Sequence, residues 1–430
     1  MNEECEGGGH PGPTRRRLLA TTGTGVAGVL AGCGYRPGGG DLAWESSLDT
    51  GGLLRTGERW LIPTDDRLIA VQNQSGRTFE FGEEEWIEVE NAIVTAIDRQ
   101  GETAMEAETE NQVRGRPAIT DSAVYLPIED GQVTAIDRGP EAEVDRTPRP
   151  GDDRVRWRRD GRRDEGRDAD DSMARPAGLR ASEDLVVAAA GDGVVAFDAA
   201  SGERAYDFSA GWSAGSRDPD RVAVGGRDVW LAVDDIALMG EPDADERGGG
   251  SPGVVRLDPS GAPRETRTVS DAVDWLAVAG DTLLAGIAAD GTLSGYGPEL
   301  DRRFTLDVPT PTNRPPVVSG PAGPRVYLRR AGAVRAVDVA DGEIAWERSD
   351  VPTPRQSAVS GEGIYAVGSR DGDPLLVAVD ARGDDWWTAP LPADVGVDEL
   401  FAVGDRLVVA DGSELYGLHA SPGERWSLIE

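Results

Sequence analysis

The chain has 430 residues, of which 78 are Asp or Glu and 44 are basic, and every basic residue is arginine. The formal net charge of −34 argues against a nucleic-acid-binding protein, because affinity for phosphates comes from clustered Lys and Arg. Hydrophobic residues make up 38% of the chain, an ordinary fraction for a folded domain, so the charge does not indicate disorder.

The acidic, lysine-free composition favours a protein adapted to concentrated salt. At molar ionic strength the Debye length is about 3 Å, so the repulsion between surface carboxylates is screened. Arginine is also favoured by a GC-rich genome, and we expect both causes to act. This composition is typical of a halophilic archaeon.

Residues 1–32 have the pattern of an export signal that ends in a lipidation site. Arg15 and Arg16 form a twin arginine, and a weakly hydrophobic, Gly-rich run follows from Leu18 to Leu30. This pattern resembles the twin-arginine signals that export folded proteins. Leu30-Ala31-Gly32-Cys33 resembles a lipobox, which predicts cleavage before Cys33 and a lipid on that cysteine. The alternative is a plain secretory signal with a chance cysteine.

Lipidation predicts where the protein resides. With a lipid on Cys33, residues 33–41 become a short Gly-rich tether, and the body lies at the extracytoplasmic face of the cell membrane. The only other cysteine is Cys5, upstream of the twin arginine, so no disulfide framework can form within the mature chain.

Residues 42–430 carry a repeat of short alternating apolar runs separated by Asp-Gly and Ser-Gly turns. Each copy contains a strand, a tight turn, a second strand ending in Ala-x-Asp, a Gly-containing turn and an aromatic residue. The clearest copies are Val326 to Trp346, Ile364 to Trp387, Leu185 to Tyr206 and Leu407 to Trp426, with a truncated copy at Ala123 to Asp137. The sequence therefore predicts an all-β chain.

The spacing of the copies predicts a β-propeller, because its period is that of one four-stranded blade, about 40 residues. Seven blades follow directly, with a charged insert at 139–180, which we expect to be disordered, and a short loop insert at 240–253. Arg59 to Glu108 holds two signatures and is interpreted as one compressed blade, which gives eight, or nine if each is separate. Whether Leu42 to Leu48 supplies the closing strand stays open.

The recurring aromatic residues are predicted to be structural. An aromatic side chain that follows the turn glycine can cover the joint between two blades and bury a large area. We therefore interpret four residues as joint aromatics and not as a ligand cage, namely Tyr206, Trp346, Trp387 and Trp426.

The pattern of Ala-x-Asp, then Gly, then Trp resembles the PQQ-like repeat, over most of residues 42–430. The eight-bladed propellers of that family include the quinoprotein alcohol dehydrogenases and an outer-membrane assembly lipoprotein that is a non-catalytic scaffold. The resemblance implies the propeller fold and leaves the function open, because one fold carries many activities.

Candidate catalytic and metal-binding residues are scarce. The chain has only His10 and His419, so a His-cluster metal site is excluded. The family's dehydrogenases use the quinone PQQ, Ca²⁺ and an adjacent cysteine pair, and this chain has no such pair. Asp371-Gly372-Asp373 offers spaced carboxylates without the spacing of a twelve-residue calcium loop, and we interpret it as a turn. We expect no catalytic residue and no cofactor, with PQQ and Ca²⁺ disfavoured.

The insert at 139–180 differs from the acidic rest of the chain. It holds eleven Arg and eleven Asp or Glu, and six of the arginines surround Trp157 between Arg154 and Arg163. Alone, that run resembles a patch for nucleic acid or anionic lipid. We favour a disordered loop neutralised by its own acids, because counterion release gives little affinity at high salt. A partner contact through this loop remains a hypothesis.

Two functions are consistent with these patterns. The first is a monomeric, lipid-anchored scaffold that binds another protein or a cell-surface component, without catalysis. The second is a quinone-dependent or sugar-active oxidoreductase that uses the axial funnel. A ring of carboxylates, Arg and an exposed aromatic at one funnel mouth would favour the enzyme. A funnel plugged by side chains, together with an apolar patch on the rim, would favour the scaffold.

Overall fold

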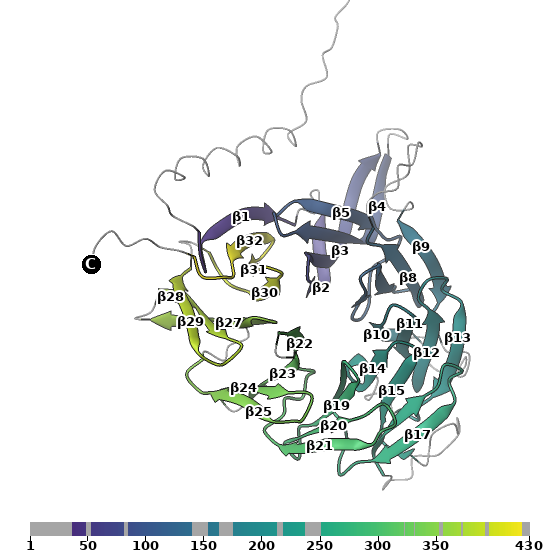
Figure 1. Ribbon diagram of the computed structural model, residues 1–430. Coiled ribbons are helices and arrows are strands. Elements are labelled where there is room, and N and C mark those ends of the chain that lie inside the picture. Colours follow the sequence, from purple (N-terminus) through teal and green to yellow (C-terminus); the bar gives the residue numbers. More distant parts are fainter. Residues whose placement is uncertain are drawn as a thin grey trace, which may run out of the picture.

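Eight four-stranded antiparallel sheets form a ring in the computed structural model (Figure 1). The predicted all-β, eight-bladed propeller is confirmed, so counts of seven and nine blades do not hold. The structure describes residues 37–48, 53–80, 85–139, 154–162, 175–212, 218–236, 251–321, 323–330, 332–351, 356–370, 373–391 and 395–423.

Blades 1 to 4 each take four strands in chain order. Blade 1 contains β2 (Leu54–Pro63), β3 (Arg67–Glu80), β4 (Glu85–Asp98) and β5 (Thr103–Glu108), and blade 2 contains β6 (Ala118–Ile119), β7 (Ala123–Pro127), β8 (Gln132–Asp137) and β9 (Val155–Asp160). Blade 3 contains β10 (Pro176–Ala181), β11 (Leu185–Ala190), β12 (Gly193–Asp198) and β13 (Arg204–Ser209), and blade 4 contains β14 (Val222–Gly225), β15 (Asp228–Val233), β16 (Gly253–Leu257) and β17 (Pro263–Thr268).

Blades 5 to 7 follow the same order, and blade 8 borrows its last strand from the other end of the chain. Blade 5 contains β18 (Trp275–Ala279), β19 (Thr282–Ile287), β20 (Thr292–Tyr296) and β21 (Arg302–Asp307), and blade 6 contains β22 (Val317–Gly320), β23 (Gly323–Arg330), β24 (Ala333–Asp338) and β25 (Ile344–Arg348). Blade 7 contains β26 (Ser357–Ser360), β27 (Gly363–Arg370), β28 (Asp373–Asp380) and β29 (Asp385–Pro390), and blade 8 contains β30 (Glu399–Val403), β31 (Arg406–Asp411), β32 (Glu414–His419) and β1 (Leu42–Ser47).

The burial pattern reflects the position of each strand in its blade. First strands of neighbouring blades contact one another, so they lie nearest the axis. Middle strands pack on both faces against adjacent blades, and therefore β11 and β19 are buried at every residue instead of alternating. The outermost strand β21 alternates exposed and half-buried residues, as a strand with one solvated face does.

Strand β1 closes the ring. It pairs antiparallel with β32, with Trp44 opposite Gly417 and Ser46 opposite Leu415, and β2 of blade 1 then contacts β30 of blade 8. The segment whose role the sequence left open is therefore the outer strand of the last blade, so the ring is closed without a covalent link.

A long hairpin projects from blade 1. Strands β3 and β4 each have 14 residues and pair from Arg67–Asp98 out to Glu80–Glu85, whereas β2 pairs only as far as Leu54–Ser75. Beyond Ser75 the pair continues as a two-stranded ribbon (Figure 1). We call residues 76–80 and 85–89 the projecting hairpin. Residues 59–108 are one blade, as predicted. The second signature lies along β4, which begins in the projecting hairpin and continues as the third strand of the blade, so the blade is lengthened and not compressed.

The charged insert contains one complete strand and most of another, contrary to the prediction. Val155–Asp160 is strand β9, the outer strand of blade 2, and Pro176–Ala181 is β10 of blade 3. The prediction of a disordered insert over 139–180 is therefore wrong for these two segments. The many arginines of β9 obscure its strand pattern, in which half-buried residues precede and follow Trp157, at 5% exposure. Residues 140–153 and 163–174 lie outside the described residues, as do 237–250 of the second insert.

The acidic surface should make the thermal stability of the protein depend on salt concentration. We expect the thermal unfolding midpoint to fall when NaCl is reduced from about 1 M to about 0.1 M, because the Debye length grows from about 3 Å to about 10 Å and the excess carboxylates repel one another. Circular dichroism at several salt concentrations measures this. An unchanged midpoint across that range would contradict the interpretation of the charge.

Candidate functional site

The predicted joint aromatics contact the neighbouring blade. The indole N–H of Trp346 in blade 6 donates to the carbonyl of Ala381 in blade 7 at 3.1 Å, and that of Trp387 in blade 7 donates to Ala420 in blade 8 at 2.8 Å. The turn glycine Gly383 has φ of 89°, and a Cβ there would lie 2.7 Å from the Trp346 ring. These side chains therefore pack in the joints between blades.

Each blade has an outer-strand position equivalent to that of Trp346 and Trp387. Its occupants are Trp44, Met105, Trp157, Tyr206, Glu265, Phe304, Trp346 and Trp387, and the residues opposite them on the third strand are Gly417, Ala96, Ala135, Ala196, Arg256, Gly295, Ala336 and Ala378. Seven of the eight opposing residues are Ala or Gly, which makes room for a large side chain. Sequence reasoning missed Trp44 and Trp157, and Trp426 lies outside the described residues.

Blade 4 has a charged joint. Arg256 takes the place of the small residue and is 8% exposed. Its guanidinium pairs with Asp228 at 3.0 Å and with Glu265 at 3.4 Å. One cation is thus balanced by two carboxylates, and the hydrogen bonds to Asp228 raise the pKa of Arg256 against the opposing effect of burial.

The arginines of the charged run are engaged in local contacts. Arg156 pairs with Asp137 at 2.6 Å, Arg158 pairs with Glu110 at 3.0 Å, and Arg159 donates to the carbonyl of Gly202 in blade 3 at 3.0 Å. The run therefore holds β9 against its neighbours, which supports neither a nucleic-acid patch nor a free basic loop.

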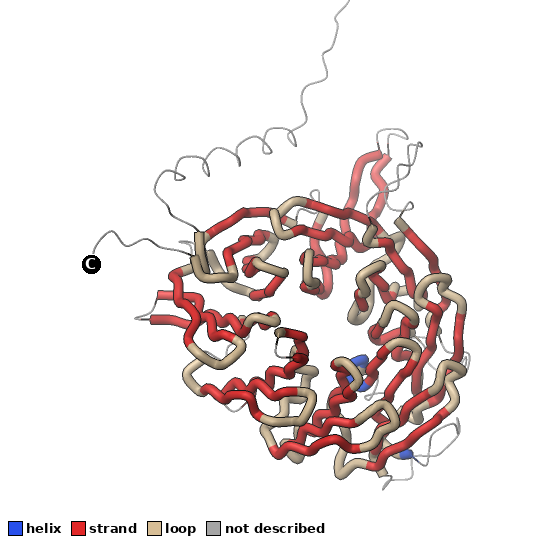
Figure 2. The backbone as a smooth tube through the Cα atoms, viewed as in Figure 1, coloured by secondary structure: helices blue, strands red, loops and turns tan. Residues whose placement is uncertain are grey.

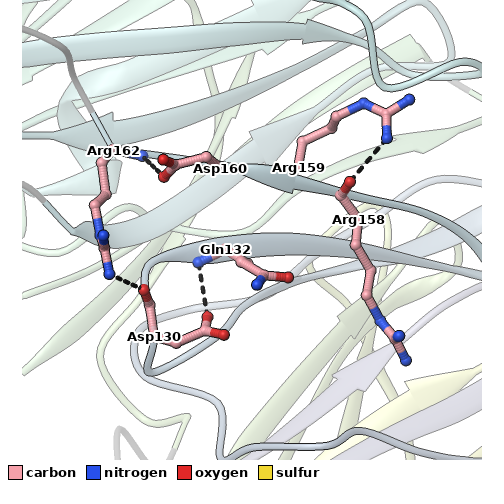
Figure 3. Close-up of a pocket in the computed structure, with 6 residues that line it drawn as sticks. All are labelled: Asp130, Gln132, Arg158, Arg159, Asp160 and Arg162. Carbon is pink, nitrogen blue, oxygen red and sulfur yellow. Dashed lines mark hydrogen bonds between the residues drawn. The ribbon is translucent and has the colours of Figure 1, made fainter.

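A hollow of about 400 Å³ lies beside this run (Figure 3). It is lined by Asp130, Gln132, Arg158, Arg159, Asp160 and Arg162. Asp130 accepts the backbone N–H of Gln132 at 2.9 Å, and Asp160 accepts that of Arg162 at 3.0 Å, so both carboxylates are turn caps (Figure 3). The lining holds no Ser, Thr, Cys, Lys or His, and both of its carboxylates are engaged in these turn contacts.

A second charged cluster lies at the axis. Asp220 belongs to the helical turn η1 (Pro219–Arg221), which lies on the inner side of the ring (Figure 2). Its carboxylate, 11% exposed, accepts Arg116 at 3.2 Å, the Arg180 guanidinium, and the backbone N–H of Arg314 at 3.2 Å. We call Arg116, Arg180, Arg314 and Asp220 the axial cluster.

The members of the axial cluster come from three connectors and one strand. Arg116 lies in the connector between blades 1 and 2, Asp220 in that between blades 3 and 4, Arg314 in that between blades 5 and 6, and Arg180 in β10. The carbonyl of Arg116 accepts the backbone N–H of Leu179 in β10 at 2.9 Å, so Arg116 lies against blade 3. Arg314 reaches Asp220 from two joints further along the ring, and the network therefore ties these segments together on the inner side of the ring.

Burial affects the arginines of this cluster. The pKa of Arg180 is lowered to about 9, first by burial and then by the charges of Arg314 and Arg116. The pKa of Arg314 is lowered to about 10, again mainly by burial, although Asp220 acts in the opposite direction. Positive charge is therefore crowded here in an otherwise strongly acidic protein.

The projecting hairpin carries the most exposed aromatic side chain among the described residues. Trp86 is 65% exposed, and its ring meets that of Phe79 edge-on at 5.5 Å. Arg77 and Glu88 form a 2.7 Å ion pair two register positions nearer the ring. The hairpin lies on the same face as the blade connectors, because its tip extends beyond the point where β2 begins.

Within the described ranges no three or more His, Cys, Asp or Glu residues are gathered as metal ligands, and no helix there has the length and apolar character to span a bilayer. His419 is half-buried at the end of β32, where burial lowers its pKa. Arg15, Arg16 and Cys33 lie outside the described residues, and so does Asp371.

Comparison with known proteins identifies the type of repeat. A family model described as "Outer membrane protein assembly factor BamB" matches residues 330–428. The structure is similar to that of BamB from Moraxella catarrhalis, with 17% identity, coverage of 88% of this chain and 97% of that chain, and a TM-score of 0.50. It is also similar to the computationally designed Ika8 protein, with 12% identity, coverage of 89% and 98%, and a TM-score of 0.50. None of the curated proteins compared matches this chain.

Proposed function

We propose that this protein is a non-catalytic scaffold that binds another protein through the projecting hairpin. The observation that carries the proposal is Trp86, an aromatic side chain 65% exposed at the end of a ribbon that contributes nothing to the blade beyond Ser75. Tryptophan is enriched among the residues that dominate the energy of protein interfaces.

The axial cluster supports binding over catalysis. A ring of carboxylates, Arg and an exposed aromatic at one funnel mouth would favour the enzyme. Here a single carboxylate, that of Asp220, meets the arginines on the inner side of the ring, and the exposed aromatic Trp86 lies on the hairpin. The match of residues 330–428 to the assembly-factor family favours the same choice, since that family's name describes assembly and no reaction.

We also propose export by the twin-arginine route and lipid anchoring through Cys33 at the extracytoplasmic face of the membrane, in a halophilic archaeon. The order and spacing of Arg15, Arg16 and Cys33 support this. A folded, acidic domain suits an export route that carries folded proteins.

Substitution of Cys33 tests the anchor. We expect Cys33→Ser to release the protein from the membrane fraction into the medium, because no other attachment is proposed. Fractionation followed by immunoblotting measures this, with Cys5→Ser as the matched control that stays membrane-bound. A Cys33→Ser protein that remains in the membrane fraction contradicts lipid anchoring at this residue.

Shortening the hairpin tests the binding role. Ser75 and Glu90 are register partners, so residues 76–89 can be replaced by Asn-Gly, which forms a two-residue hairpin turn. We expect the shortened protein to fold and to lose the proteins that copurify with the wild type from solubilised membranes at physiological salt.

Two single substitutions sharpen that experiment. Trp86→Ala should reproduce the loss, whereas Ile344→Ala, at an exposed apolar residue of β25, should retain the partner. Equal recovery of the same partner by the wild type, the shortened protein and Trp86→Ala would contradict docking through the hairpin.

A further inference from the structure

The axial cluster has more positive than negative charge. The guanidinium groups of Arg116 and Arg180 both contact the one carboxylate of Asp220, and the backbone N–H of Arg314 donates to the same carboxylate, which brings a third arginine to this place. The next carboxylate is that of Asp218, and it accepts the backbone N–H of Asp220 at 2.8 Å as the cap of η1. Among the described residues, three arginines face two acids in this cluster.

Blade 4 shows what a purely structural arginine looks like in this protein. Arg256 is about as buried as Arg180, and it has two carboxylate partners for one guanidinium. The axial cluster reverses that ratio. Burying excess charge in this way is costly unless another group supplies the missing anion.

At least one hydrogen-bonding group of the cluster has no partner among the described residues. The Nε of Arg180 is buried without a partner, and the guanidinium of Arg314 has no carboxylate within ion-pair distance among the described residues. Arg116 is 54% exposed along its side chain, so solvent reaches the cluster. Arginines that are brought together from two connectors and β10 and are reached by solvent are the ingredients of an anion site.

We propose that the axial cluster binds one small oxyanion, a phosphate or a carboxylate, with Arg116, Arg180 and Arg314 as its donors. The planar guanidinium fork matches both kinds of oxyanion, and such charge-assisted hydrogen bonds are among the strongest in proteins. In this proposal the carboxylate of Asp220 orients the arginines, and it also competes with the ligand for their N–H groups. This inference does not depend on the proposed docking through the hairpin.

Equilibrium dialysis with labelled inorganic phosphate, and separately with labelled citrate, tests the proposal in the full-length protein at constant ionic strength set with NaCl. We expect one site per chain. Arg314→Gln and Arg116→Gln should each weaken binding about tenfold, the loss expected for one hydrogen bond between charged groups. Asp220→Asn should tighten binding, because it removes the competing carboxylate.

Arg158→Gln is the matched control, since it removes an arginine from the hollow beside β9, and binding should be unchanged. Binding of phosphate alone identifies a phosphate ligand, and binding of citrate alone identifies a carboxylate ligand. The proposal is overturned if neither probe shows a saturable site, or if the axial variants bind like the wild type. Should Asp220→Asn fail to fold by near-UV circular dichroism, Arg116→Gln decides, because its side chain is half exposed.

Discussion

Replacing Trp157 with alanine is expected to lower the free energy of unfolding by about 3–5 kcal/mol, the usual cost of truncating a large buried aromatic side chain. Trp157 is 5% exposed, lies about 6 Å from the rings of Tyr125 and Phe197, and donates its indole N–H to Ala199 in the next blade at 3.0 Å. The substitution removes that hydrogen bond and opens the joint between blades 2 and 3. Denaturant unfolding at fixed salt measures the change.

Trp86→Ala is the matched control for this experiment, because it removes the same side chain from a site that is 65% exposed. We expect its effect to stay within about 0.5 kcal/mol, as for most surface substitutions. If Trp157→Ala also stays within that range, β9 does not have the structural role assigned to it.

Removing strand β1, Leu42–Ser47, is expected to have a larger effect, because it opens the ring. Trp44 of this strand packs over Gly417 and over Gly101 of blade 1, and its indole N–H donates to Arg99 at 2.8 Å. The deletion takes the outer strand from blade 8 and leaves the edge of β32 unpaired. We expect that the protein without β1 no longer unfolds in a single cooperative transition. We also expect proteases to cut it in blades 8 and 1 before the other blades.

Two substitutions in β1 distinguish the effect of opening the ring from the effect of losing individual side chains. Trp44→Ala should cost about 3 kcal/mol, at the low end for tryptophan since the side chain is half-buried. Leu42→Ser, at a side chain that is 43% exposed, should be nearly neutral. A protein without β1 that unfolds cooperatively at the wild-type midpoint would contradict closure by this strand.

The sequence was sufficient to predict the propeller because its repeat is local. An Asp-containing turn, a left-handed glycine and an aromatic follow one another closely in each copy, so they can be recognised without knowing the fold. Asp198 illustrates the turn, since it accepts the backbone N–H of Ser201 at 3.0 Å, the main cause of its lowered pKa. The blade count followed from the period of these features.

Features that depend on distant residues could not be predicted. Trp157 stood among arginines whose partners lie 19 to 48 residues away in the chain, so the run looked like a basic patch. Trp44 pairs with a strand at the opposite end of the chain, and Asp220 meets Arg314 from a connector two joints away. A repeat pattern gives no information about which connectors meet at the centre. The projecting hairpin was mistaken for compression because its second signature suggested another blade.

Site-specific photo-crosslinking at residue 86 in cells tests the scaffold role most directly. A photoreactive amino acid replaces Trp86, and another replaces Ile344 as a control at an exposed apolar site on the ring. We expect one discrete crosslinked protein at position 86, which mass spectrometry can identify. The same protein should not be crosslinked at position 344. Crosslinks at position 344 but none at position 86 would contradict the hairpin as the docking element, and no protein crosslink at either position would contradict the scaffold role.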